Sequence, residues 1–248
     1  SGSLEFTHTD VSLPGNNKLQ VSVGRHLATG TRLATLRGGL FGDWDLEIPH
    51  LHTVAENSDT WYGNGTVSPN LFRCSQFQMP PAAAYSSPEG PRLAFSWQYW
   101  DGYHLYVPGS GDQTMLGRRA SPGDAAAPPN FLQPTDGLQY PVVTKQNWQF
   151  SCLPAMERGS GEGFLARAPD GTRYQFDHMV SRTHQHYMAR GGLMPRTEIW
   201  ILPTQVTDRF GNWIRYQYSG SDGWRVDSIT SSDGRSITFT YTGTSNRI

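Results

Sequence analysis

The chain has 248 residues, a formal net charge of −1 at pH 7 and 12% aromatic residues. A disordered chain is not expected to carry so many aromatic residues, and the small net charge argues against a nucleic-acid binder or a polybasic membrane-surface protein. No stretch approaches the roughly 18 uninterrupted apolar residues of a membrane helix, and 27 glycines with 17 prolines leave little room for long helices. We therefore expect a folded chain that is rich in turns.

Short strands account for most of the apolar patterning along the chain. Leu19–Val23 alternates apolar and polar residues, as a strand with one buried face does. Tyr174–Val180 alternates in the same way, whereas residues 182–190 have no clear period and fit a short helix or a loop. Residues 199–202 (IWIL) are apolar throughout, which predicts a strand covered on both faces, and Ser236–Tyr241 alternates again. These segments predict an all-β fold of antiparallel hairpins.

Two long loops interrupt this pattern. Residues 79–91 and 120–134 are rich in Pro, Ala, Ser and Gly, and proline removes the backbone donors that a strand ladder needs. The second loop, residues 120–134, is the better candidate for a domain boundary. We expect an N-terminal β region at 1–119, a loop or linker at 120–134 and a β-hairpin region at 135–248.

Three carboxylates alternate in the segment Asp43, Asp45 and Glu47. On a strand they share one face, where they are able to bind a cation or act as an acid–base pair in a glycosidase. An exposed acidic strand edge opposite a buried Trp44 and Leu46 explains the same alternation, and we favour that interpretation.

Two His-x-His pairs are candidate metal ligands. His50 with His52, and His184 with His186, place two rings on one side of a strand, and His178 lies near the second pair. No third ligand stands at a recognisable spacing, so hydrogen-bonded or solvated histidines are the better interpretation. The sequence also lacks the patterns of a catalytic serine, a catalytic cysteine dyad or a phosphate-binding loop. We predict no catalytic residue, no metal and no cofactor.

Residues 95–106 carry six aromatic side chains in twelve positions. On a strand, positions 95, 97 and 99 share one face and position 100 lies on the other, as in a strand buried between two sheets. The alternative is a platform of Trp97, Tyr99 and Trp100 on which sugar rings stack.

Cys74 and Cys152 are the two cysteines of the chain. A disulfide in an exported protein and a pair of buried thiols remain equally open. The first residues, Ser1-Gly2-Ser3, resemble residues added for expression, and we expect the chain to be part of a longer protein.

A repeat lies near the C-terminal end. Gly211 and Gly234 stand 23 residues apart, and aromatic residues follow each of them at positions +5 and +7. These rings are Tyr216, Tyr218, Phe239 and Tyr241. A shorter copy starts at Gly171, with rings at +3 and +5. An Asp-Gly or Gly-Asn pair supplies the positive-φ positions of a tight hairpin turn, and the next strand then places two rings on one face.

These motifs resemble a known family. Residues 206–218 (VTDRFGNWIRYQY) and 229–241 (ITSSDGRSITFTY) resemble the RHS/YD repeat of bacterial polymorphic toxins and related surface proteins. Residues 6–25 and 42–49 are similar to the segment that opens the RHS region. The resemblance covers roughly residues 165–248 and 4–50, with one tyrosine position occupied by Phe239, and the self-cleavage motif of complete members is absent.

The resemblance implies a fold and a function. It implies hairpins in a curved sheet or partial shell that encloses or presents a C-terminal toxin or effector segment of a longer secreted or cell-surface bacterial protein. The chain is then a non-catalytic scaffold whose partner is the rest of its own polypeptide, with secretion machinery or surface glycans as further candidates. A cell-surface carbohydrate-binding β module is the alternative. The residues assigned to the structural repeat are Gly171, Gly211, Asn212, Tyr216, Tyr218, Gly234, Arg235, Phe239 and Tyr241.

Overall fold

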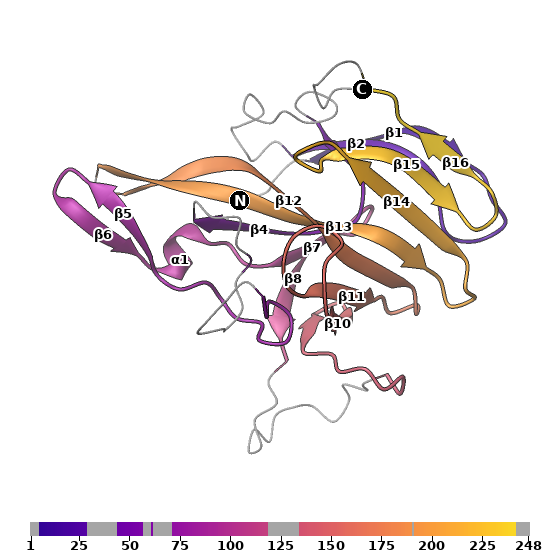
Figure 1. Ribbon diagram of the computed structural model, residues 1–248, viewed down its shortest axis with the longest axis horizontal. Coiled ribbons are helices and arrows are strands. Elements are labelled where there is room, and N and C mark those ends of the chain that lie inside the picture. The colour runs from indigo at the N-terminus through magenta and orange to yellow at the C-terminus, as the bar shows by residue number, and fades with distance from the viewer. Residues whose placement is uncertain are drawn as a thin grey trace.

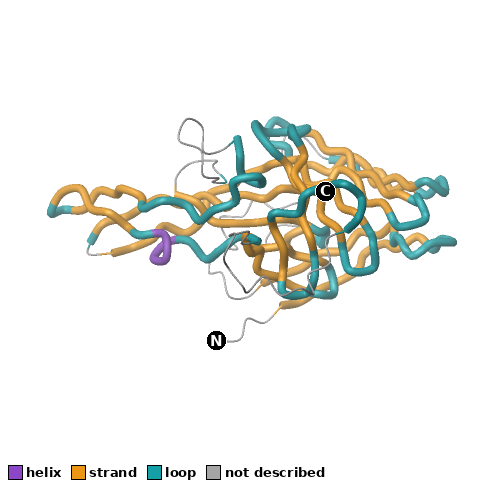
Figure 2. Tube along the Cα trace, turned by 90° about the horizontal axis from the view of Figure 1, so that it is seen from below, coloured by secondary structure: helices purple, strands orange, loops and turns teal. Residues whose placement is uncertain are grey.

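The computed structural model describes residues 5–28, 44–56, 61, 71–118, 134–189 and 191–241. In this part of the chain, strands make up nearly all of the regular structure, and the helix α1 (Ser96–Tyr99) is a single turn (Figure 2). Neighbouring strands pair antiparallel throughout these residues. The predicted antiparallel all-β fold is therefore confirmed. Among the same residues, no helix has the length and apolar character needed to cross a membrane.

Eight strands close into a barrel. They are β4 (His50–Glu56), β7 (His104–Val107), β8 (Gly111–Gly117), β9 (Val142–Thr144), β10 (Gln149–Leu153), β11 (Gly163–Arg167), β12 (Arg173–Ala189) and β13 (Gly192–Thr207). Their order is β12-β11-β10-β9-β8-β7-β4-β13, and the pairing of β12 with β13 closes the ring (Figure 1). Closure gives these strands partners on both sides, which removes exposed edges.

Side chains fill the interior of the barrel. Apolar residues at alternate positions of its strands point inward, and the largest of them have no solvent exposure. The barrel is therefore a packed core and not a channel. Its fully buried members include Leu51, Leu105, Phe150, Phe164, Phe176, Ile199 and Ile201.

A second apolar core lies beside the barrel. Beyond β13 the sheet continues through β14 (Trp213–Ser219), β15 (Arg225–Ser231) and β16 (Ser236–Thr238). A three-stranded sheet of β1 (Glu5–Leu13), β2 (Val21–Ala28) and β3 (Asp45–Leu46) packs against this extension (Figure 1). The side chains buried between the two sheets include Val21, Val23, Leu202, Ile214, Val226 and Ile229.

Strand β13 is the wall shared by both cores. Ile199 and Ile201 face the interior of the barrel, whereas Trp200 and Leu202 face the second core. All four side chains are at most 4% exposed. The prediction of a strand covered on both faces is confirmed, because successive side chains of a strand point to opposite faces.

The β12–β13 hairpin projects beyond the barrel and, with β5 (Ala83–Ser87) and β6 (Gly90–Ala94), forms an arm at the left of Figure 1. The loop expected at residues 79–91 is therefore wrong for residues 83–87 and 90–91, because Pro91 lies in β6, which pairs with β5 alone in the described residues, and an edge strand tolerates proline. Residues 182–189 belong to β12, so the expected short helix or loop is wrong for them; Arg190 lies outside the described residues. Pairing with β13 from Arg182↔Glu198 to Ala189↔Gly192 satisfies their backbone groups despite the weak apolar pattern.

Cys74 and Cys152 form a disulfide, which settles the alternative left open by the sequence. The bond joins the segment after residue 71 to β10. Buried Arg73 strengthens this attachment, because its guanidinium donates to the Glu162 and Ser160 carbonyl oxygens at 2.7 and 2.6 Å. The bridge and Arg73 together hold this segment against the barrel.

The barrel takes strands from both sides of the Pro-rich loop. β4, β7 and β8 precede residues 120–134, and β9 to β13 follow them. The regions 1–119 and 135–248 therefore share one core in the described structure. The loop itself lies outside the described residues, except for Pro134.

Candidate functional site

Three hairpin turns have the same geometry. They join β11 to β12, β13 to β14 and β15 to β16, and their glycines, Gly171, Gly211 and Gly234, have φ of 89°, 88° and 88°. In each turn the glycine N–H donates to the carbonyl three residues earlier, at 3.0, 3.2 and 3.1 Å. The positive φ expected at these glycines is present. The glycine alone carries it, so the expectation that Asn212 or Asp233 shares this conformation is wrong; the turns are three-residue loops with glycine at the left-handed position.

Tyr218 and Tyr241 make equivalent hydrogen bonds. The hydroxyl of Tyr218 donates to the Pro203 carbonyl at 2.7 Å, and that of Tyr241 donates to the Val226 carbonyl at 2.8 Å. Each acceptor lies 15 residues before its tyrosine. Side chains at all four ring positions of the repeat pack against the second core: Tyr216, Tyr218, Phe239 and Tyr241.

Asn212, the residue after the turn glycine Gly211, makes its hydrogen bonds within its own turn. The side-chain amide of Asn212 donates to Asp208 at 2.7 Å, and its backbone N–H donates to the same carboxylate at 3.0 Å. Asn212 therefore stabilises its own turn, and Asp208 has a lowered pKa, chiefly because of the Asn212 hydrogen bond.

Arg235 reaches across to the N-terminal hairpin. Its guanidinium donates to the Leu13 carbonyl at 3.1 Å and the Leu19 carbonyl at 3.2 Å, and it pairs with Asp233 at 2.8 Å. Gly15 allows this approach, because a Cβ at that position would lie 2.2 Å from Arg235 Cζ. The two segments that resemble the RHS region are thus in direct contact, which the sequence analysis did not predict.

The aromatic segment does not form the expected strand. Residues 96–99 form α1, and the Gln98 side chain accepts the Phe95 N–H at 2.8 Å across this turn. Trp97 is 75% exposed and lies parallel to Phe95, with ring centroids 6.2 Å apart. The helical turn could not be predicted from the sequence, because four residues are too few to show a period.

The predicted sugar platform of Trp97, Tyr99 and Trp100 is not assembled. Tyr99 is 2% exposed and donates its hydroxyl to the Pro81 carbonyl at 2.6 Å. Trp100 is half-buried and donates its ring N–H to Thr53 Oγ1 at 2.9 Å. Because the helical turn separates the three rings, only Trp97 presents its face to solvent.

Two acidic residues share the buried Arg182. Its guanidinium lies 2.6 Å from Asp45 and 2.9 Å from Glu198. Burial alone would lower the pKa of Arg182, but the two carboxylates raise it above its ordinary value. This ion pair joins β3 to β12 and β13, so Asp45 holds the three-stranded sheet in place.

Glu47 is also buried in a hydrogen-bonded cluster. Both of its carboxylate oxygens accept from the Tyr106 hydroxyl, at 2.8 and 2.9 Å, and one lies 3.0 Å from His26 Nδ1. The side chains of Asp45 and Glu47 are 6% and 12% exposed, so the expected exposed acidic edge is wrong for both. Asp43 lies outside the described residues. The sequence pattern could not show these partners, which come from distant strands.

His50 and His52 are structural. His50 is buried against Trp200, with ring centroids 3.6 Å apart, and burial followed by its neighbour His52 holds its pKa well below the ordinary value. Although burial opposes it, the 2.9 Å hydrogen bond with Asp112 raises the pKa of His52. In turn, the hydrogen bond with His52 lowers the pKa of Asp112, although burial of that carboxylate acts in the opposite direction.

The second histidine pair does not gather further ligands. In the described part of the chain, no group of three or more His, Cys, Asp or Glu side chains is arranged to hold a metal ion. A register shift separates His184 from Tyr187, and His186 is exposed. His178 lies apart, with its Nε2 2.9 Å from the Gly223 carbonyl oxygen and its ring stacked on Tyr218.

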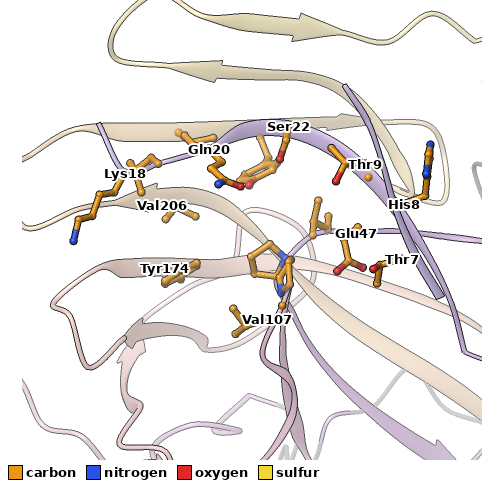
Figure 3. Close-up of a pocket in the computed structure, with 18 residues that line it drawn as sticks. Thr7, His8, Thr9, Lys18, Gln20, Ser22, Glu47, Val107, Tyr174 and Val206 are labelled. Atoms are coloured by element: carbon orange, nitrogen blue, oxygen red, sulfur yellow. The ribbon is translucent and has the colours of Figure 1, made fainter. Parts of the chain in front are cut away.

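A cavity of about 440 Å³ lies where the three-stranded sheet meets β12, β13 and β14 (Figure 3). Ser22 borders it from β2 and Gln20 from the residue just before β2. Tyr174 and Val206 border it from the opposite strands, and Glu47 lies at one end. This cavity could not be predicted from the sequence, because its walls come from segments that are far apart along the chain.

The chain matches no known protein-family model, and a search of curated proteins finds no significant match. The RHS/YD resemblance therefore rests on the sequence motifs alone.

Proposed function

We propose that the chain is a non-catalytic structural scaffold, a fragment of an RHS/YD-repeat shell that encloses or presents a C-terminal toxin or effector segment of a longer secreted protein. One observation carries the proposal. The 23-residue spacing of Gly211 and Gly234 recurs in Tyr218 and Tyr241, whose hydroxyls bind carbonyls at the same distance along the chain. A sequence repeat that is also a repeat of hydrogen bonds supports a structural unit that can be copied.

The geometry supports growth of a sheet by such units. Each unit adds two antiparallel strands and one glycine turn, and the turns stand side by side, since the N–H of Ser232 donates to the Trp213 carbonyl at 2.9 Å. In the described residues, β16 pairs with β15 alone, so its other edge can accept a further strand. Aromatic rings on one face would then extend the second core from unit to unit.

The position of an enclosed segment follows from packing. Because its own side chains fill the eight-stranded barrel, a cargo belongs beside the extended sheet and not inside this barrel. The disulfide is consistent with an oxidising compartment, which supports a secreted or cell-surface location.

The coding sequence downstream of Ile248 tests the proposal. We expect further copies of a glycine turn followed by Tyr or Phe at +5 and +7, then an unrelated segment. Limited proteolysis of the full-length protein should leave that last segment protected while the shell is folded. Absence of further copies, or a last segment cleaved as fast as an isolated peptide, would contradict the proposal.

A further inference from the structure

The cavity between β2 and β12–β14 contains several polar groups without protein partners. Among the described residues, the hydroxyls of Tyr174 and Tyr216 make no hydrogen bond, and neither oxygen is sealed from solvent. The side chains of Gln20, Ser22 and Thr9 likewise have no hydrogen-bond partner in this part of the chain. Gln20 and Thr9 are exposed at the rim, whereas Ser22, Tyr174 and Tyr216 are partly buried. Partly buried polar groups usually find partners, so the three unpaired hydroxyls at this cavity point to a ligand.

The two tyrosines lie close together and are protonated at neutral pH. Burial, followed by Asp170, raises the pKa of Tyr174 to about 12. Burial and the neighbouring Tyr174 raise the pKa of Tyr216 further. Each phenol therefore offers both a donor and an acceptor, beside an apolar wall of Val206 and Ile214.

Glu47 adds an acceptor whose position is fixed. The Tyr106 hydroxyl and His26 hold its carboxylate from behind, at 2.8–2.9 Å and 3.0 Å, while it still lines the cavity. A group held in place before the ligand arrives loses little conformational entropy on binding.

The charge in the cavity narrows the class of ligand. An anion would face Glu47, and the basic side chains of the lining, Lys18 and His8, are both exposed. A metal ion would find one carboxylate and no three-ligand cluster among the described residues. A wholly apolar ligand would cover the tyrosine hydroxyls without pairing them, which costs free energy.

We propose that this cavity binds an uncharged polyhydroxylated ligand, a sugar ring or the end of an oligosaccharide, between β2 and the strands that carry Tyr174 and Tyr216. Ligand hydroxyls pair with the two phenols, Gln20, Ser22 and Glu47, and the CH face of the ring packs on the apolar wall. This site goes beyond the scaffold role and does not depend on it.

Titrations with uncharged sugars test the site. The probes are glucose, N-acetylglucosamine and their β-1,4-linked disaccharides, followed by two-dimensional NMR of the whole chain, with inorganic phosphate as the charged comparison. We expect saturable binding of at least one sugar, with a dissociation constant of about 1 mM or lower. Shifted signals should include those of Gln20, Ser22 and Glu47.

The double variant Tyr174→Phe/Tyr216→Phe separates binding from folding. It keeps both rings and removes hydroxyls that have no partner in the described structure, so the melting temperature should not fall. Sugar affinity should fall by about tenfold or more, which corresponds to about 1.4 kcal/mol. The matched control Trp97→Ala, which removes the exposed ring on α1, should leave sugar affinity unchanged.

Three results would overturn the proposal. The first is the absence of binding by all the sugar probes, and the second is phosphate binding tighter than sugar binding. The third is sugar binding that survives the double tyrosine variant but is lost in Trp97→Ala, which would move the site to the exposed rings of Phe95 and Trp97.

Discussion

At the residue scale, His50 makes folding depend on pH. Burial, followed by its neighbour His52, keeps its pKa in the folded protein well below 6.5. The unfolded chain takes up a proton on this ring below about pH 6.5, whereas the folded chain does not. Stability is therefore lost as the pH falls through that value, by at most about 1.4 kcal/mol per pH unit from this residue.

The variant His50→Phe keeps an aromatic ring on Trp200 and removes the titration. We expect the free energy of unfolding of the native protein to fall more steeply than that of the variant between about pH 7 and about pH 5. Urea denaturation at a series of pH values measures both curves. His26, His52 and Glu198, the other ionisable groups that influence His50, are present in both proteins, so parallel curves would contradict the prediction.

Gly15 and Arg235 form a second residue-scale pair. Gly15→Ala places a methyl group against the guanidinium, and Arg235→Ala removes its bonds to the Leu13 and Leu19 carbonyls. Each change should destabilise the protein by about 1–3 kcal/mol. Because the three atoms nearest to that methyl group all belong to Arg235, the double variant should lose less than the sum.

Hydrogen exchange locates that effect. Amide protection should fall in β1 and β2 and stay unchanged in β10 and β11, which lie in the barrel. The matched control is Gly117→Ala, since a Cβ there meets its nearest atom, on Phe77, at an ordinary 3.5 Å. Additive losses, or equal losses of protection in the barrel, would show that the contact between Gly15 and Arg235 is not what holds the hairpin.

At the element scale, Gly234 sets the last hairpin turn. Its φ is 88°, and an added Cβ would meet no atom within 4 Å. The cost of Gly234→Val is therefore conformational and not steric crowding, and should be about 1–2 kcal/mol. Gly234→Asn should cost less, because Asn tolerates positive φ. Thermal unfolding compares the two variants, and an equal loss in both would count against this account of the turn.

Local features of these elements could be predicted from the sequence, whereas distant contacts could not. The turn glycines and the continuous apolar run at residues 199–202 depend on neighbours in sequence. The structure has a positive φ at each of these glycines and buries both faces of the run. Residues 182–189 show no period, yet they form a strand because β13 supplies their partners. Tertiary pairing overrides weak local preference in such a segment.

The candidate sites likewise depend on features that the sequence pattern does not report. Burial of Tyr99 follows from the helical turn at residues 96–99, whose four residues give no periodic signal. The Arg182–Asp45 pair spans 137 residues, and the walls of the cavity come from both ends of the chain. No spacing rule reports contacts of this kind, because they depend on how the two sheets pack.

At the scale of the whole molecule, β13 couples the barrel to the second core. Its alternate side chains belong to both cores, so neither core can lose this strand without exposing the other. We therefore expect a change confined to the barrel to alter the unfolding of both cores together, and the disulfide provides that change.

The bridge between Cys74 and Cys152 closes a loop of 78 residues. Removing it frees the unfolded chain more than the folded one, and the double variant Cys74→Ala/Cys152→Ala should lose about 2–5 kcal/mol of stability. Urea denaturation gives this loss.

Fluorescence of Trp200 and Trp224, in the second core, should change in the same transition as the circular dichroism of the strands. A reducing agent should lower the midpoint of the native protein and leave the variant unchanged. A variant with the native midpoint would contradict the role of the bridge, and separate transitions would contradict the coupling through β13.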